Sequence, residues 1–591
     1  MKNKLYISLI LVALFAGGCE NPLDVTPYDK YGSDFVFGEP KKAEEYVMRT
    51  YNVFPYGTDS YGFNRLESGK SMIACASDEA MPNLPGGNVD NLINGSWSPS
   101  SSNPDSQWDV NYQFIRSANI GLENIDMLPE TSATLHDQLY GELLFIRAYA
   151  HFELIKRYGG IPIITKSLTL NDELNIPRNT FKECVDFVIS QCDLALPYLL
   201  TPDLASGGQL GKISKGAAIA LKSRMLLYAA SDLYNGPAYD GSTNNLVGYG
   251  TYSKVCWEDA AKAAADVTAL GYYALYKPSA IIDTQNDATV KTNGEKNYAD
   301  LFYTLSGNKE LILIRTVAQS NGVEKKNNPV GYTNGGGTTN PSQQMVDAYG
   351  MLNGKKITDA ASGYLATNPY NNRDPRFNVS IFYNDKAWTG NPSRTKVETF
   401  VDGLDNKITA TNATKTGYYL SKFMKSGIVI SGTETKTNHC FPLFRYAEIL
   451  LNYAEAMNEA YGPDVDPKGY GKTARAAIEE VRARVLRPKD AVLSWVPSGD
   501  VAAMREAIRN ERRVELAFED QRQIDVRRWK IAPQTIGQNL SGMKITKTGT
   551  TFSYELMPNV AIRVFEPKMY LYPIPQSEMN KNKALIQNPL W

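Results

Sequence analysis

The chain has 591 residues and a formal net charge of −1, from 62 lysines and arginines against 63 aspartates and glutamates. This length can bury a large core without disulfides or a structural metal. The balanced charge and the lack of a basic tail exclude the electrostatic signature of a nucleic-acid-binding protein. Three scattered histidines and six scattered cysteines form no metal-ligand spacing, so we expect neither a metal nor another cofactor.

The N-terminus has the pattern of a secretion signal. Lys2 and Lys4 precede an apolar run over 5–15, and small residues then lead directly to Cys19. This pattern resembles a bacterial lipoprotein signal, so we expect residues 1–18 to be a signal peptide and Cys19 to be lipidated. Residues 19–35 would then form a lipidated tether that anchors the protein to a membrane. The alternative is an ordinary signal peptide in which Cys19 has no special role.

Helices dominate the rest of the predicted structure. The clearest is 135–158, where apolar residues recur at spacings of three and four before Gly159 and Gly160 end the pattern. Runs of alanine in several helices favour close helix packing, as in stacked helix pairs. The predicted helical segments are 40–54, 107–128, 135–158, 180–196, 213–233, 255–269, 445–461, 472–486 and 501–520.

Long stretches rich in Gly, Asn, Thr and Tyr separate these helices, and a compact domain rarely leaves such stretches without structure. Strand-like runs occur at 310–317 and 425–431. We therefore expect one mainly α domain over 36–591, with an irregular lobe that contains short strands. The scaffold would comprise mainly 36–55, 107–233, 255–269 and 441–530, and the loop-rich lobe mainly 56–106 and 270–440.

Six sequence elements stand in order along the chain: LFIRAYAHFELIKRYGGIPII (144–164), GKISKGAAIALKSRMLLYAAS (211–231), NRDPRF (372–377), FRYAEILLNYAEAMNE (444–459), IRNERRVELAFEDQRQIDVRRW (508–529) and YPIPQSEMNKNKALIQ (572–587). They resemble, in the same order, those of the SusD/RagB family, the outer-membrane nutrient-binding lipoproteins of Bacteroidetes. One such element would be weak evidence, whereas six behind a lipoprotein signal are specific.

The resemblance implies about four tetratricopeptide-like helix pairs with a large inserted ligand-binding lobe. It also implies an outer-membrane protein, lipid-anchored and facing the cell exterior, that captures oligosaccharide or polysaccharide without catalysis. The partner would be a SusC-like TonB-dependent transporter. Two alternatives remain: oligopeptide capture, as in the RagB branch, and glycoside hydrolysis, for which no catalytic motif is present.

A sugar site needs aromatic faces for stacking and polar groups for the hydroxyls. Family members commonly place an aromatic residue of the loop after the first helix in the glycan site, and Trp97 matches that place. Packing is the alternative for Trp388, and pairing with Asp374 is the alternative for Arg373. The candidate ligand-binding residues are Trp97, Asp78, Asn94, Tyr303, Tyr332, Trp388 and Arg373.

Of two patterns of charged residues, the first is not expected to form a catalytic pair and the second is expected to stabilise a helix. Adjacent Asp78 and Glu79 would point in opposite directions in an extended chain, which argues against a glycosidase pair. Arg512 and Glu515 lie three residues apart on the predicted C-terminal helix. We expect exposed ion pairs along this helix, each worth tenths of a kcal/mol.

Overall fold

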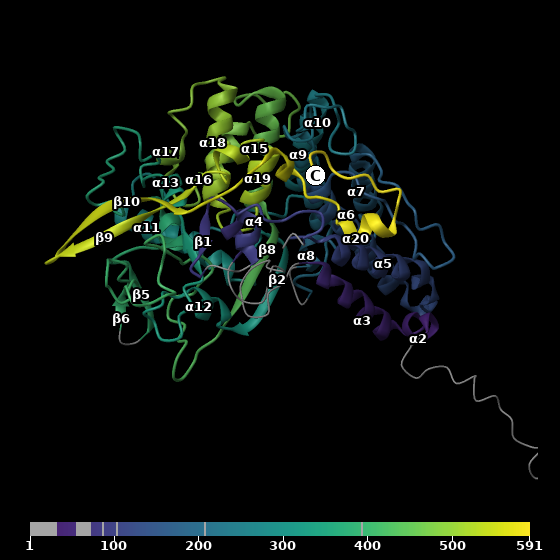
Figure 1. Ribbon diagram of the computed structural model, residues 1–591, viewed down its shortest axis with the longest axis horizontal. Helices are drawn as coiled ribbons and strands as arrows, with labels where there is room; N and C mark the ends of the chain where they lie inside the picture. The colour runs from purple at the N-terminus through teal and green to yellow at the C-terminus, as the bar shows by residue number, and fades with distance from the viewer. Residues whose placement is uncertain (1–31, 55–71, 85–87, 102–104, 206–208, 392–393) are drawn as a thin grey trace, which may run out of the picture.

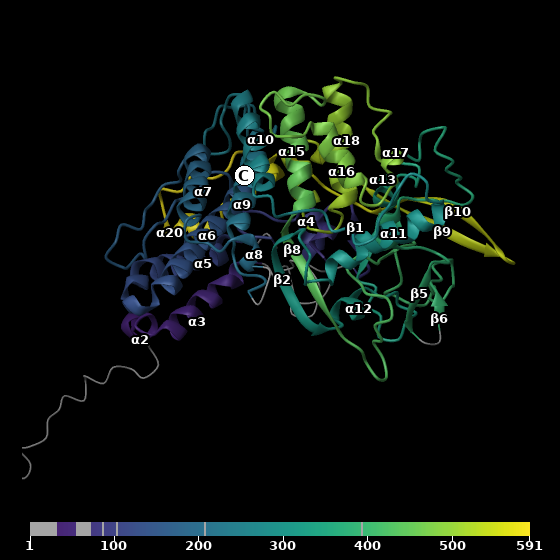
Figure 2. The ribbon, with the colours of Figure 1, turned by 180° about the vertical axis from the view of Figure 1, so that it is seen from behind.

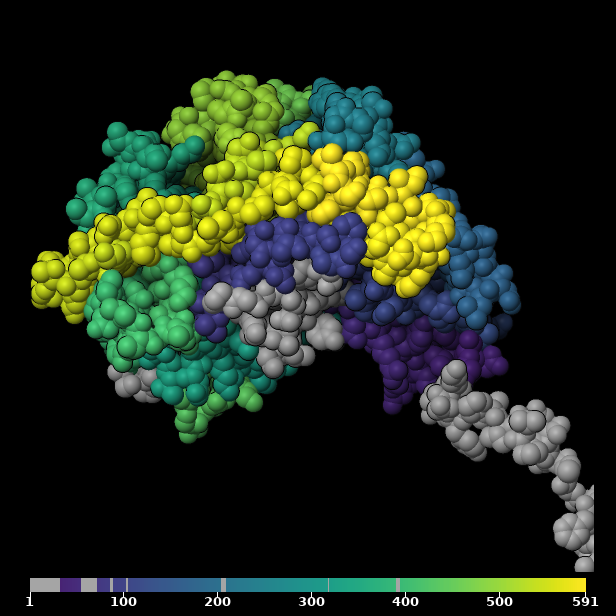
Figure 3. Space-filling model, in the orientation of Figure 1, coloured from purple at the N-terminus to yellow at the C-terminus, as the bar shows by residue number. Residues whose placement is uncertain are grey.

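The computed structural model forms an arch, with a helical half and a loop-rich half that meet above a concave lower face (Figures 1 and 3). Cys19 and most of the tether lie outside the described part of the chain. The structure describes residues 32–54, 72–84, 88–101, 105–205, 209–391 and 394–591.

The helical half is an array in which each long helix packs against the next, from α5 to α18. All nine predicted helical segments are confirmed, with ends that differ by a few residues. Their bounds are α3 Pro40–Thr50, α5 Trp108–Asn124, α6 Ala133–Tyr158, α7 Phe181–Ala195, α9 Lys215–Ala230, α10 Lys254–Ala269, α15 Tyr446–Tyr461, α16 Ala474–Arg482 and α18 Val501–Glu515.

Local chemistry explains where these helices begin and end. The Thr180 hydroxyl and the Glu183 carboxylate form a reciprocal capping box at the start of α7. Helix α6 ends at Gly159, whose φ of 76° suits glycine. Helix α6 is buried almost all round from Leu139 to Ile155, because α5 and α7 flank it. In the described part of the chain, no helix has the length and apolarity to cross a bilayer.

Shorter helices complete the two halves. Helix α11 belongs to the loop-rich half and was not predicted from the sequence, because its few apolar residues give no clear helical stripe. The shorter helices are α2 Ser33–Phe37, α4 Asn88–Ile93, α8 Pro202–Ala205, α11 Asp287–Ala299, α12 Gly322–Asn327, α13 Gln343–Ala348, α14 Pro375–Ser380, α17 Pro488–Ala491, α19 Arg522–Arg528 and α20 Gln576–Lys581.

Every sheet in the described residues has two antiparallel strands. Strand β2 (Leu311–Ser320) confirms the predicted run at 310–317 and pairs with β8 (Thr437–Arg445), whereas 425–431 forms turns and no strand. Hairpin β9–β10 projects from the loop-rich half (Figure 2). The other strands are β1 Ala80–Pro82, β3 Thr339–Pro341, β4 Ile381–Phe382, β5 Ala387–Asn391, β6 Arg394–Lys396, β7 Tyr419–Leu420, β9 Leu540–Thr548 and β10 Thr551–Ala561.

A buried ion network joins the two halves and corrects the expectation of exposed pairs on the C-terminal helix. Glu515 is fully buried and lies 2.7 Å from Arg445 and 2.9 Å from Arg376. Arg512 is likewise buried and pairs with Asp525. Removing one partner from such pairs is strongly destabilising. We call the following set the central ion network: Asp374, Arg376, Glu511, Arg482, Glu515, Arg445, Arg484, Glu310, Glu519 and Lys422.

Candidate functional site

Three predicted aromatic residues are part of the core. Trp97 is only 3% exposed, donates its indole N–H to the Leu92 carbonyl and packs against the rings of Tyr572 and Trp591. Trp388 donates to Asn328, and Tyr332 donates to the Lys396 carbonyl. Both rings are buried. The expectation that these rings line a sugar site is therefore corrected, because no ring face remains open for stacking.

Two predicted charged residues are also structural. The carboxylate of Asp78 accepts two hydrogen bonds from the Arg522 guanidinium and pairs with Arg513 at 2.9 Å. Burial alone would raise the pKa of Asp78, but these two arginines outweigh it and hold the pKa well below its ordinary value. Arg373 is buried and donates to the carbonyls of Val346, Tyr349 and Pro369. Neither side chain is left for a ligand, which corrects both expectations.

The remaining two candidates are more accessible. Asn94 is exposed, and its side-chain oxygen accepts a hydrogen bond from the Ser96 backbone N–H. Tyr303 is half-buried, with the Lys425 ammonium 5.5 Å from its ring centroid. Neither residue lines the groove described next, so their contact with a ligand stays a prediction.

A groove of about 650 Å³ lies between α3 and β2. We call it the α3–β2 groove. Its volume falls within the range of about 300–1,000 Å³ that is typical of small-ligand sites. Both apolar and polar side chains line it: Glu44, Met48, Tyr51, Phe54, Gln138, Gln209, Leu210, Lys212, Ile314, Arg315 and Thr316.

Charges of both signs face one another across this groove. The Lys212 ammonium lies 3.4 Å from the Glu44 carboxylate and 3.8 Å from that of buried Glu142. Burial raises the pKa of Glu142 more than Lys212 lowers it, and one oxygen of Glu142 has no hydrogen-bond partner within the described residues. The site therefore offers both hydrogen-bond donors and acceptors, which a ligand rich in hydroxyl groups requires.

Aromatic and polar groups form the rest of the groove. Tyr51 and Phe54 are buried beneath it, and their rings meet edge to face at 5.6 Å. Arg315 of β2 donates to the Tyr51 carbonyl at 3.3 Å, and Gln209 is exposed nearby. The groove thus combines buried aromatic rings with polar side chains among its lining residues.

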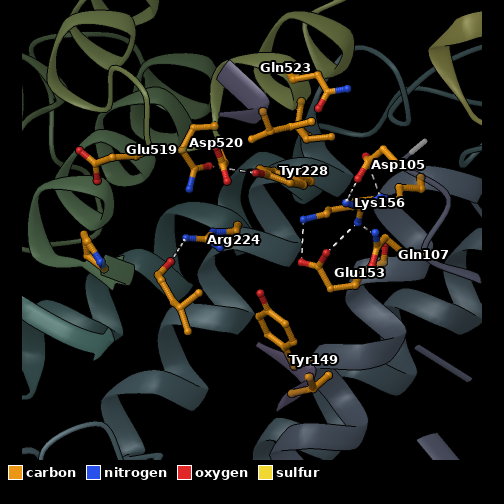
Figure 4. Close-up of a pocket in the computed structure, with 17 residues that line it drawn as sticks. Asp105, Gln107, Tyr149, Glu153, Lys156, Arg224, Tyr228, Glu519, Asp520 and Gln523 are labelled. Atoms are coloured by element: carbon orange, nitrogen blue, oxygen red, sulfur yellow. Dashed lines mark hydrogen bonds and ion pairs between the residues drawn. The ribbon is translucent and has the colours of Figure 1, made fainter. Parts of the chain in front are cut away.

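A second, interior cavity lies between α6, α9 and the segment before α19 (Figure 4). Its volume of about 80 Å³ is far below the ligand range, so it accommodates a few waters at most. Glu153 pairs with Lys156 at 2.6 Å, and Arg157 pairs with Asp105 at 2.9 Å. Asp520 also lines the cavity, and burial raises the pKa of its carboxyl group well above the ordinary value.

Asp520 is unusual in two further respects. Its backbone adopts a left-handed φ of 60°, and both carboxylate oxygens are buried without a hydrogen-bond partner within the described residues. The other charged groups on the cavity wall have ion-pair partners, such as Arg224 with Glu448 at 2.6 Å. The interior cavity therefore contains one unpaired acid among paired charges.

Sequence reasoning missed the groove because its residues come from distant segments. Lys212 belongs to the GKISKG stretch, and Arg315 follows four apolar residues in the predicted strand 310–317. An arginine inside an apolar strand was an available signal that one strand face is wet. No sequence pattern brings that strand beside α3.

The fold and the groove define a mainly helical protein with a ligand-sized groove. The family model described as "SusD family" matches residues 280–591, more than half of the chain, and the model described as "Starch-binding associating with outer membrane" matches 23–227. The chain belongs to the SusD family, whose members are non-catalytic binding proteins. The mainly helical SusD-like fold that the sequence predicted is confirmed.

Relatives and solved structures agree. SusD-like protein P38 of Formosa agariphila is 28% identical in a match that covers 38% of this chain and 42% of P38. SusD-like protein P25 of the same organism is 22% identical in a match that covers 81% of this chain and 78% of P25. The chain thus spans less than half of P38. A SusD-like protein of Bacteroides fragilis is 27% identical, with a TM-score of 0.73 over 97% of this chain and all of that one. A SusD-like carbohydrate-binding protein of the same species shares the fold, with 22% identity and a TM-score of 0.69. The match covers 93% of this chain and 100% of that one.

Proposed function

We propose that the protein is a cell-surface glycan-binding lipoprotein that captures oligosaccharide or polysaccharide and delivers it to a SusC-like TonB-dependent transporter. The α3–β2 groove carries this proposal, because it has the volume of a small-ligand site. It also offers hydrogen-bond donors, such as the Lys212 ammonium, and acceptors, such as the Glu44 carboxylate. Membership in the SusD family supports it. So does the likeness to solved structures described as a carbohydrate-binding protein and as a surface glycan-binding protein of Bacteroides fluxus.

Native gel electrophoresis tests the glycan part of the proposal. Purified mature protein is run through gels that contain soluble starch, xylan, laminarin, galactomannan or pectin. We expect at least one polysaccharide to retard the wild type. The double variant Gln209→Ala, Arg315→Ala removes two polar side chains of the groove and should lose at least tenfold in affinity.

The control is Lys544→Ala, on the exposed β9–β10 hairpin, which should migrate like the wild type. Equal retardation of the groove variant would contradict the assignment of the groove. If no polysaccharide retards the wild type, the glycan proposal is wrong. Calorimetry with tryptic casein peptides would then test oligopeptide capture.

The membrane part of the proposal rests on Cys19, which lies outside the described residues. In cells fed radiolabelled palmitate, the wild type should incorporate label and sediment with outer membranes. Cys19→Ala should do neither. A variant that is unlabelled yet still anchored at the surface would refute the lipid anchor. Failure of the solubilised wild type to co-purify any TonB-dependent transporter would refute the partnership.

A further inference from the structure

A third pocket lies between the loop that follows α13 and helices α16 and α18. Helices α16 and α18 lie on the side of the arch away from its concave lower face (Figure 1). We call it the α18 pocket. Its volume is about 320 Å³, within the range of small-ligand sites and four times that of the interior cavity. None of its lining residues is shared with the α3–β2 groove.

Trp495 forms an aromatic wall of this pocket. It lies in the loop between α17 and α18, is half-buried, and has an indole N–H without an acceptor within the described residues. The Lys356 ammonium lies 4.0 Å from the ring centroid. Lys356 is exposed and has no ion-pair partner in the described part of the chain. Exposed cation–π contacts are weak, so this flexible side chain can swing aside and uncover the ring.

Hydrogen-bonding groups surround the ring. Glu506 projects exposed from α18, and Asp347 is exposed at the end of α13. The side-chain amide of Asn510 donates to the Ala348 carbonyl at 3.2 Å. With Lys356, the pocket rim thus carries both signs of charge, which gives no preference for an ionic ligand.

The floor of the pocket is rigid. Asp374, Arg376, Glu511 and Arg482 of the central ion network lie beneath it, and each is held by ion pairs. A rigid floor fixes the position of the groups above it, and a fixed geometry lowers the ordering cost of binding.

We propose that the α18 pocket is a second saccharide site, which binds a single sugar or the end of a glycan chain against Trp495. An indole face packs on the apolar C–H face of a sugar ring, while Glu506, Asp347 and Lys356 contact its hydroxyls. The pocket volume restricts the ligand to a short segment. This inference rests on the proposed glycan-binding function and adds a site that is separate from the α3–β2 groove.

Calorimetry on the mature full-length protein tests the proposal. The titrant is the short oligosaccharide released from whichever polysaccharide retards the wild type in gels, with maltoheptaose as the probe for starch. We expect two sites per chain. Trp495→Ala should leave one site with unchanged affinity, and Glu506→Ala should weaken only the second site by at least tenfold.

Two further variants make the test decisive. Trp495→Phe keeps an apolar ring if the alanine variant fails to fold, and it should retain weakened binding at the second site. Tyr252→Ala removes an exposed aromatic residue elsewhere and should keep both sites. The groove variant Gln209→Ala, Arg315→Ala should lose only the first site.

The outcomes separate the two proposals. If the wild type has a single site, which the groove variant loses and Trp495→Ala retains, the second site is overturned. The proposed function is then unaffected. A wild type that binds none of the probes would overturn the proposed function, and the second site with it.

Discussion

The central ion network and the wall of the interior cavity both contain buried charged side chains. Every member of the network has an ion-pair partner, whereas one acid of the cavity wall has none in the described residues. Glu515 lies among Arg376, Arg445 and Arg484, whereas Asp520, five residues further along, has no partner within the described residues. A paired buried charge holds elements in place, and an unpaired one costs stability. The comparison shows that one short segment places an acid with three arginine partners five residues from an acid that has none in the described part of the chain.

Breaking the network should have the largest effect. We expect Glu515→Gln to lower the free energy of unfolding by about 3–5 kcal/mol, because it leaves buried guanidinium groups without their counter-charge. Urea denaturation measures this loss. The control is Glu506→Gln on the same helix, where an exposed pair should change stability by less than about 1 kcal/mol. Equal effects of the two changes would contradict a stabilising network.

Glu79 should make the stability of the fold depend on pH. Burial raises the pKa of Glu79 to about 7, although the Phe518 backbone N–H donates to it. A raised pKa favours the protonated folded state, so stability is present at low pH and falls as the pH rises from about 4.5 to about 7. Glu79→Gln should remove roughly 3 kcal/mol of this decline, measured as the difference in unfolding free energy between pH 5 and pH 8. An unchanged decline would contradict the prediction.

Replacing the unpaired acid should stabilise the fold. We expect Asp520→Asn to raise the free energy of unfolding by about 1–3 kcal/mol at pH 8, because a neutral amide is cheaper to bury than an unpartnered carboxylate. Burial raises the pKa of Asp520, so the gain should shrink as the pH falls and the wild-type acid becomes protonated. Thermal unfolding at several pH values measures it. A loss of stability at pH 8 would show that the cavity contains a partner for Asp520.

An exposed pair should have the smallest effect. Lys544 and Glu555 lie 3.1 Å apart on opposite strands of the β9–β10 hairpin, and both are exposed. Lys544→Ala should change the free energy of unfolding by no more than about 0.5 kcal/mol, because solvent screens such pairs. A larger loss in urea denaturation would mean that the hairpin is coupled to the core.

Periodicity predicted the scaffold well because long helices carry their pattern locally. The nine helical segments needed only the spacing of apolar residues and a terminal glycine or cap, as at Gly159 and Thr180. Burial of charge is not local. The spacing of Arg512 and Glu515 predicted the helix correctly but not the ion-pair partners that cover it, which come from segments up to 139 residues away.

The candidate site was harder to predict for the same reason. Trp97 lies in a polar loop, and only the distant C-terminal segment with Tyr572 and Trp591 turns it into core. Conversely, Arg315 lies in an apolar strand but reaches the groove because β2 passes near α3. Exposure of a loop residue depends on what the rest of the chain places over it.

The burial of α6 has a kinetic consequence. This 26-residue helix has neighbours on almost every side, so no local fraying exposes its central peptide groups to water. Amide protons between Leu139 and Ile155 should therefore exchange with deuterium only when the whole scaffold opens. Their exchange rate then reports the global stability of the protein, and any ligand that tightens the scaffold will slow them together.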